Sequence, residues 1–157
     1  MYSKMKGGRI LDYVYNLLIY LFILFPIVAI IHEFGHAFFA LLFKQKIDEI
    51  SIGMGNVIVK IGSFKIRSAY FAFGWVKLKE RRMSKFQEFI FLMGGIIFNL
   101  ITAVILDLVT EYEFLNFRNY LDSFIFLSYI TGILNIIPFT TIHGDTDGKQ
   151  ILQLFKG

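Results

Sequence analysis

Three long apolar segments, separated by polar connections, dominate the pattern of this chain. They cover about residues 12–43, 86–109 and 120–139. As a helix at about 1.5 Å per residue, the first apolar run would extend for roughly 51 Å, whereas a bilayer core is crossed in about 30 Å. The run is nonetheless too short for two spans with a turn, so we expect one long tilted helix, with Pro26 as the expected position of any kink. The pattern therefore predicts three transmembrane helices.

The connection between the first two apolar segments has a different pattern. Residues 47–80 contain short stretches of β-branched and aromatic residues divided by glycine, which are typical of strands. Gly62-Ser63 is a suitable turn between two of them. We therefore expect an α-helical membrane protein with a three-transmembrane-helix core, a small membrane-associated β-hairpin or sheet between the first two helices, and a single domain over residues 1–157.

Composition supports a membrane location and narrows the chemistry. Hydrophobic residues make up 56% of the 157 residues, far more than an ordinary soluble domain of this size contains. The lipid bilayer is thus an expected partner. Because the chain has no cysteine, disulfides, thiolate metal ligands and a cysteine nucleophile are excluded. Any transition metal would need histidine and carboxylate ligands.

Basic residues are distributed unevenly between the connections. The net charge is +4, but no basic recognition helix is present, so we expect no nucleic-acid partner. The connection after the first apolar segment contains ten Lys and Arg residues, whereas the next contains only Arg118. By the positive-inside rule, the first of these connections should face the cytoplasm, although Lys4, Lys6 and Arg9 near the N-terminus favour the opposite orientation. We expect a multi-pass protein of a bacterial plasma membrane, with its active site toward the cytoplasmic side. The ten residues are Lys44, Lys46, Lys60, Lys65, Arg67, Lys77, Lys79, Arg81, Arg82 and Lys85.

The first apolar segment contains the sequence His32-Glu33-Phe34-Gly35-His36. Two histidines at i and i+4 lie one helical turn apart on one face, where both can reach a single zinc ion. Glu33 beside them has the chemistry of a general base for a metal-bound water. Polar packing between helices is the alternative, but three ionisable residues within an apolar segment are costly, which favours a functional site.

Zinc in a hydrolase needs a third protein ligand and an open position for water. The candidates follow the third apolar segment in a turn-rich stretch, where His143, Asp145 and Asp147 are available. Taken alone, the Asp-Thr-Asp-Gly sequence is also typical of an ordinary solvated turn. The residues by themselves leave the third ligand open.

Several short motifs follow one another along the chain: His32 to His36, FGWVKL from Phe73 to Leu78, Gly95 to Asn99, NIIP from Asn135 to Pro138, and Asp147-Gly148 in DGKQIL. Together, and in the same order, they resemble the site-2 protease family of intramembrane zinc metalloproteases over about residues 20–155. By this resemblance His32, His36 and Asp147 would bind one zinc ion per chain, and Glu33 and Asn135 would be catalytic. The common family spacing would put His143-Gly144 at this position, so reaching Asp147 requires a four-residue insertion. Asp147 still ranks first, because DGKQIL resembles the start of the family's helix after Asp-Gly, and Asp145 and His143 rank second and third.

The chain departs from the family in its brevity, and we expect a minimal catalytic core without a PDZ domain. It would be a zinc-dependent intramembrane endopeptidase that cleaves a peptide bond in or near a transmembrane segment of a membrane protein or peptide substrate, with a regulatory membrane partner as a further expectation. We expect Asn99 only to form a hydrogen bond between helices, and the pair Gly94-Gly95 only to let helices approach closely. The alternative function is a non-proteolytic, zinc-stabilised membrane regulatory or immunity protein, which closed four-ligand coordination would distinguish.

Overall fold

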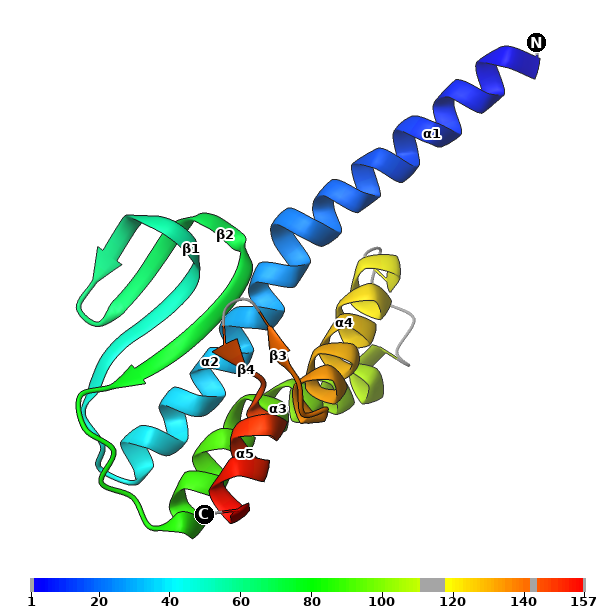
Figure 1. Cartoon of the computed structure of the whole chain (residues 1–157). Helices are drawn as coiled ribbons and strands as arrows, with labels where there is room; N and C mark the ends of the chain where they lie inside the picture. The colour runs from blue at the N-terminus through cyan, green and yellow to red at the C-terminus, as the bar shows by residue number, and fades with distance from the viewer. Residues whose placement is uncertain (1, 111–117, 142–143, 157) are drawn as a thin grey trace.

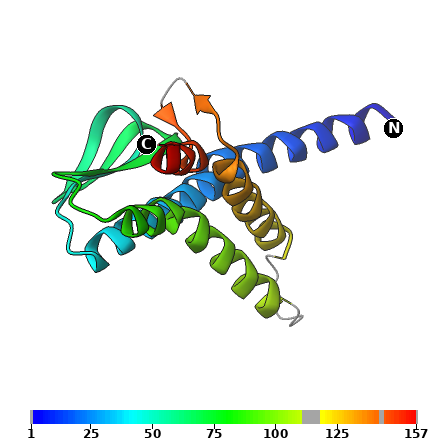
Figure 2. The same cartoon turned by 60° about the horizontal axis from the view of Figure 1, so that its bottom comes forward.

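The computed structural model describes residues 2–110, 118–141 and 144–156. A continuous helical rod forms the N-terminal part, consisting of α1 (Tyr2–Ile19), η1 (Tyr20–Leu24) and α2 (Phe25–Leu42). Its α1 end projects away from the other elements in two views of the molecule (Figures 1 and 2). Pro26 does not break the rod. The preceding turn, η1, is a π-turn in which the Phe25 N–H donates to the Tyr20 carbonyl, and proline is tolerated in the first turn of the helix that follows.

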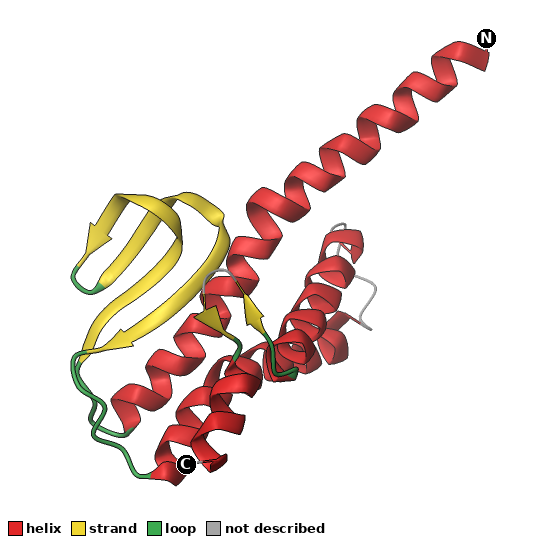
Figure 3. Cartoon of the chain, viewed as in Figure 1, coloured by secondary structure: helices red, strands yellow, loops and turns green. Residues whose placement is uncertain are grey.

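The predicted hairpin is confirmed, and it is larger than a simple pair of strands. The strands β1 (Ile47–Ile61) and β2 (Phe64–Leu78) pair in an antiparallel sheet, joined by a turn at Gly62-Ser63 (Figure 3). Both strands curve, so that residues 50–52 of β1 pair with residues 64–66 and also with residues 74–76 of β2. Gly53 and Gly55, at φ of 84° and 82°, allow β1 to bend. Among the described residues, no other strand pairs with residues 74–76.

Alternation along β1 separates an apolar face from a polar one. Ile50 and Ile52 are buried on one face, while Glu49 and Ser51 are buried on the other. Arg67 donates hydrogen bonds to the Glu49 carboxylate over 2.7 Å and to the Ser51 hydroxyl over 2.7 Å, and Lys65 donates to the other Glu49 oxygen. Burial raises the pKa of Glu49, but the hydrogen bonds and charges of Lys65 and Arg67 outweigh it and lower the pKa to about 2. The ionised carboxylate therefore ties the two strands together.

The second long helix crosses α2 closely. In α3 (Lys85–Thr110) the Gly94 carbonyl oxygen lies so near Gly35 of α2 that a Cβ on Gly35 would come within 2.2 Å of it. Glycine at both positions therefore permits the helices to touch backbone to backbone, as predicted for helix packing. Below this crossing, Ala40 of α2 packs with Phe91 and Leu92 of α3 in a buried cluster.

The C-terminal part of the chain packs against α2 and α3. It consists of α4 (Arg118–Ile136), the short strands β3 (Thr140–Thr141) and β4 (Gly144–Asp145), and α5 (Asp147–Lys156). Ile151 and Leu154 of α5 pack against the cluster of Ala40, Phe91 and Leu92, which docks α5 on the first two long helices. The strands β3 and β4 pair with each other and lie within the predicted four-residue insertion region.

Two helices of the described structure are long and apolar enough to cross a membrane, Ile10–Leu42 and Lys85–Val109. The third predicted span forms a helix, but a three-helix transmembrane core is not confirmed, and the helix ends at Ile136 rather than near residue 139. Asp122, Ser128, Thr131 and Asn135 lower the hydropathy of α4, and Pro138 follows its end.

Candidate metal centre

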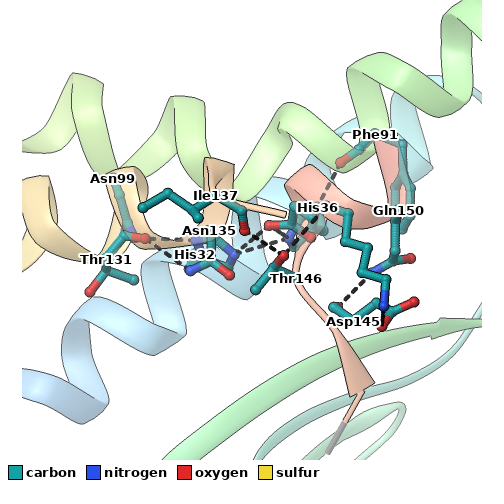
Figure 4. A network of polar contacts seen from close by, with 12 residues as sticks. His32, His36, Phe91, Asn99, Thr131, Asn135, Ile137, Asp145, Thr146 and Gln150 are labelled. Carbon is teal, nitrogen blue, oxygen red and sulfur yellow. Dashed lines mark hydrogen bonds and ion pairs between the residues drawn. The ribbon is translucent and has the colours of Figure 1, made fainter. Parts of the chain in front are cut away.

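His32 and His36 lie one turn apart on α2 and turn their rings into the interior (Figure 4). Each residue is only 6% exposed, and their Nε2 atoms are 3.2 Å apart. Two imidazole nitrogens at this distance, deep in an apolar helix pair, are costly unless they share a hydrogen atom or a cation. The spacing on the helix thus brings both rings to one point, as predicted.

Asp147 reaches the same point from the first residue of α5. Its carboxylate is buried, and Oδ2 lies 3.0 Å from His32 Nε2 and 3.4 Å from His36 Nε2. Thr146 holds the start of the helix, because its hydroxyl accepts a hydrogen bond from the Lys149 N–H and donates to the Ile137 carbonyl. The aspartate is therefore placed by a capped helix end and not by a free loop.

The three side chains fit a zinc ion. A tetrahedral zinc with bonds of about 2.0–2.1 Å needs ligand atoms about 3.3 Å apart. The three separations are 3.0, 3.2 and 3.4 Å, and one ligand atom from each residue lies within 4.8 Å of the others. Two imidazoles and one carboxylate are also a ligand set that zinc hydrolases use. Among the described residues these three make up the metal-binding group, which would leave a fourth position of the zinc ion for water.

Glu33 lies next to this group, against the sheet. It is 6% exposed, and a Cβ added at Gly74 of β2 would lie 2.6 Å from its Cγ and 2.8 Å from its Oε1. The missing side chain of Gly74 therefore leaves the space that the Glu33 carboxylate occupies. A cavity of about 1000 Å³ opens over Glu33, the two histidines and Asp147, with residues 73–76 of β2 along its wall.

Comparison with known proteins agrees with this geometry. The model of peptidase family M50 matches residues 20–114, which is more than half of the chain. The chain belongs to peptidase family M50. The resemblance to the site-2 proteases, which form this family, is thereby confirmed. Asp147 lies beyond the matched residues, so its place beside the two histidines comes from the structure.

Two curated proteins are similar to this M50 chain. The "Uncharacterized membrane protein YwmF" of Bacillus subtilis is 31% identical over 136 residues, which are 85% of this chain and 85% of that protein. The "Putative zinc metalloprotease FN1322" of Fusobacterium nucleatum is 28% identical over 102 residues, which are 56% of this chain but only 30% of that protein. M50 proteases are zinc-dependent, so family membership and the His-His-Asp group together support a zinc metalloprotease.

The alternative ligands of this M50 site are placed differently. Asp145 points its carboxylate away from the histidines, where it accepts hydrogen bonds from Thr140 over 2.6 Å and from Gln153 over 2.8 Å. His143 lies outside the described residues. Asn135 lines the cavity, and its amide donates to the Thr131 carbonyl over 2.9 Å within α4. Its catalytic role stays a prediction, as do the roles of His32, Glu33, His36 and Asp147.

Three residues of the site were missed or undervalued in the sequence. Gly95 lies against the His32 ring, where a Cβ would come within 2.5 Å of Nε2. Asn99 contacts the same ring, and a Cβ on Gly148 would lie 1.8 Å from the Ile136 carbonyl oxygen. The contacts of Gly95 and Asn99 fit the expected close approach and hydrogen bonding between helices, and both are made to the ring of His32. Their spacing of four residues on α3 was the available signal, since it places both on the face that meets α2.

Proposed function

We propose that this M50 chain is a zinc-dependent endopeptidase that hydrolyses a peptide bond in or near a transmembrane segment of a membrane protein. The observation that carries the proposal is that one cavity is lined by His32, His36 and Asp147 at zinc-ligand spacing and by Glu33 beside them. The three ligands lie on helices of an apolar chain. The carboxylate of Glu33, which would serve as the base, is buried beside them.

The roles of the residues follow from their chemistry. A zinc ion held by His32, His36 and Asp147 would polarise the scissile carbonyl and acidify a water molecule. Glu33 takes a proton from this water molecule while the water oxygen attacks the carbonyl carbon. Glu33 then gives the proton to the leaving nitrogen, so that the C–N bond breaks and a carboxylic acid and an amine result. The Asn135 amide, in the cavity wall, would donate a hydrogen bond to substrate.

The substrate would bind as an extended chain. Residues 74–76 of β2 pair with β1 through Ile50–Ile52, and they line the cavity beside Glu33. A peptide segment added along this part of β2 would satisfy its own backbone groups and bring a carbonyl to the metal. A helical transmembrane segment must therefore unwind locally before cleavage.

The membrane topology is also proposed. We place α4 in the bilayer as a third span, because Phe126, Ile133 and Leu134 present exposed apolar surface on a helix that packs against α3. The lysine-rich and arginine-rich connection around the hairpin would then face the cytoplasm of a bacterial cell. Substrate membrane proteins and a regulatory membrane protein are the proposed partners.

The Glu33→Gln substitution tests the function. Membranes from cells with the wild-type chain and with Glu33→Gln would be compared by mass spectrometry of protein N-termini. New N-termini in or near transmembrane segments should occur with the wild type only, while both purified proteins retain one zinc ion per chain. Cleavage that survives in Glu33→Gln would contradict the proposal. Zinc binding without any cleavage by the wild type would favour a non-proteolytic, zinc-stabilised regulator.

A further inference from the structure

The two histidines each turn a second ring nitrogen toward α3. His36 Nδ1 lies 2.8 Å from the carbonyl oxygen of Phe91, which can only accept a hydrogen bond. Nδ1 of His36 therefore carries the hydrogen, and its Nε2 keeps the lone pair that a metal requires. His32 Nδ1 lies 3.2 Å from the side-chain amide nitrogen of Asn99, which is completely buried.

Asn99 leaves one polar atom without a partner. Its Oδ1 is buried and makes no hydrogen bond, while Nδ2 faces the ring of His32. The two amide atoms exchange places by a half-turn of the amide group, and the hydrogen-bond network decides which orientation is preferred. If His32 is to offer the lone pair of Nε2, its Nδ1 must carry the hydrogen. That N–H needs an acceptor, which the amide nitrogen cannot be.

We propose that Asn99 is a positioning residue of the metal site: its Oδ1 accepts a hydrogen bond from His32 Nδ1–H and holds the ring in the tautomer that presents Nε2 to the metal. This inference rests on the metal binding in the proposed function. A half-turn of the Asn99 amide gives the buried Oδ1 a hydrogen-bond partner. His32 Nδ1–H then donates to Asn99, just as His36 Nδ1–H donates to the Phe91 carbonyl. Partners of this kind fix ring orientation and raise ligand basicity in metal sites.

The spacing on α3 supports this role. Phe91, Gly95 and Asn99 are four residues apart and so lie along one face of the helix. Phe91 supplies the acceptor for His36, Gly95 leaves room for the His32 ring, and Asn99 supplies the acceptor for His32. One face of α3 thus supports both histidines of α2, although it contributes no metal ligand itself.

Zinc affinity of the full-length chain in detergent, measured by competition with a fluorescent chelator, tests the inference. Asn99→Leu keeps the size of the side chain but removes the acceptor, and it should weaken zinc binding by about 10–100-fold. Asn99→Asp keeps an acceptor and should bind zinc within about threefold of the wild type, because a carboxylate accepts from an imidazole N–H in the same way. Ser128→Ala, which removes another buried polar group that lacks a partner, should leave the affinity unchanged.

Two outcomes would overturn the role of Asn99 alone. Wild-type affinity in Asn99→Leu would mean that the residue only packs between helices. A loss in Asn99→Asp as large as in Asn99→Leu would mean that an acceptor at this position is not what supports zinc binding. A wild-type chain that binds no zinc would instead overturn the proposed function together with this inference.

A second measurement needs no variant and remains decisive where a substituted protein fails to fold. Histidine labelled with ¹⁵N in the zinc-loaded wild-type protein reports the tautomer of each ring by NMR. The spectrum should show His32 with its hydrogen on Nδ1 and a metal-bound Nε2. A hydrogen on Nε2 of His32 would contradict the proposal.

Discussion

Gly95→Ala adds a single methyl group to α3, and we expect this substitution to disable the metal site. A Cβ there would lie 2.5 Å from His32 Nε2 and 2.6 Å from both Cδ2 and Cε1 of the same ring. Nonbonded atoms prefer separations of about 3.5 Å or more, so the ring in Gly95→Ala must retreat by about 1 Å. Metal–ligand distances tolerate only about 0.2 Å. We therefore expect zinc affinity to fall by about 100-fold, and peptidase activity by at least as much.

The assay is zinc content and chelator competition on the purified Gly95→Ala protein. Alanine in place of glycine favours a helix by about 0.5–1 kcal/mol, so a loss of zinc could not be assigned to a weaker α3. Gly132→Ala is the matched control, because its Cβ would only touch Leu100 at 3.3 and 3.4 Å. This variant should bind zinc like the wild type. Wild-type affinity in Gly95→Ala would refute the assigned position of the His32 ring.

Four further substitutions test other parts of the molecule. Asp147→Asn should lower zinc affinity by 100-fold or more, whereas Asp145→Asn should leave it unchanged, as measured by the same competition. The hairpin should lose stability as the pH falls from about 4.5 to about 2, because the folded state holds the pKa of Glu49 below its ordinary value. Hydrogen exchange of the β1 and β2 amides measures this loss. Glu49→Gln should remove the pH dependence and weaken the hairpin at pH 7. Gly148→Ala should displace α5 from the Ile136 carbonyl, lowering the melting temperature and the zinc affinity together.

Local patterns in the sequence predicted the elements but not all of their boundaries. The glycine-divided stretches around Gly62 predicted the hairpin, since turn residues and β-branched residues act over short distances. The curvature that lets Ile50 pair with both Phe64 and Val76 was not predictable, because it depends on tertiary packing and on the positive φ of Gly53. A π-turn at Tyr20–Leu24 precedes Pro26, and the apolar pattern of the sequence did not indicate it.

The same distinction applies to the candidate site. The sequence predicted His32, Glu33 and His36, because the two histidines are one helical turn apart within an apolar segment. The position of Asp147 needed the structure, since a four-residue insertion separates it from the family spacing and only the docking of α5 brings it to the histidines. The role of Asn99 was hidden for a similar reason: a buried amide has the same sequence pattern whether it joins two helices or supports a ring.

The meeting of α2 and α5 has a consequence for folding. His32 and Asp147 are 115 residues apart in sequence and 3.0 Å apart in space. A zinc ion held between them would act as a cross-link that closes a loop containing most of the chain, and long loops gain most from closure. At a free zinc concentration 1,000 times the dissociation constant, binding would favour the docked state by about 4 kcal/mol. The concentration of free zinc would then determine how often α5 detaches from α2 and α3. The lifetime of the folded protein would depend on that concentration.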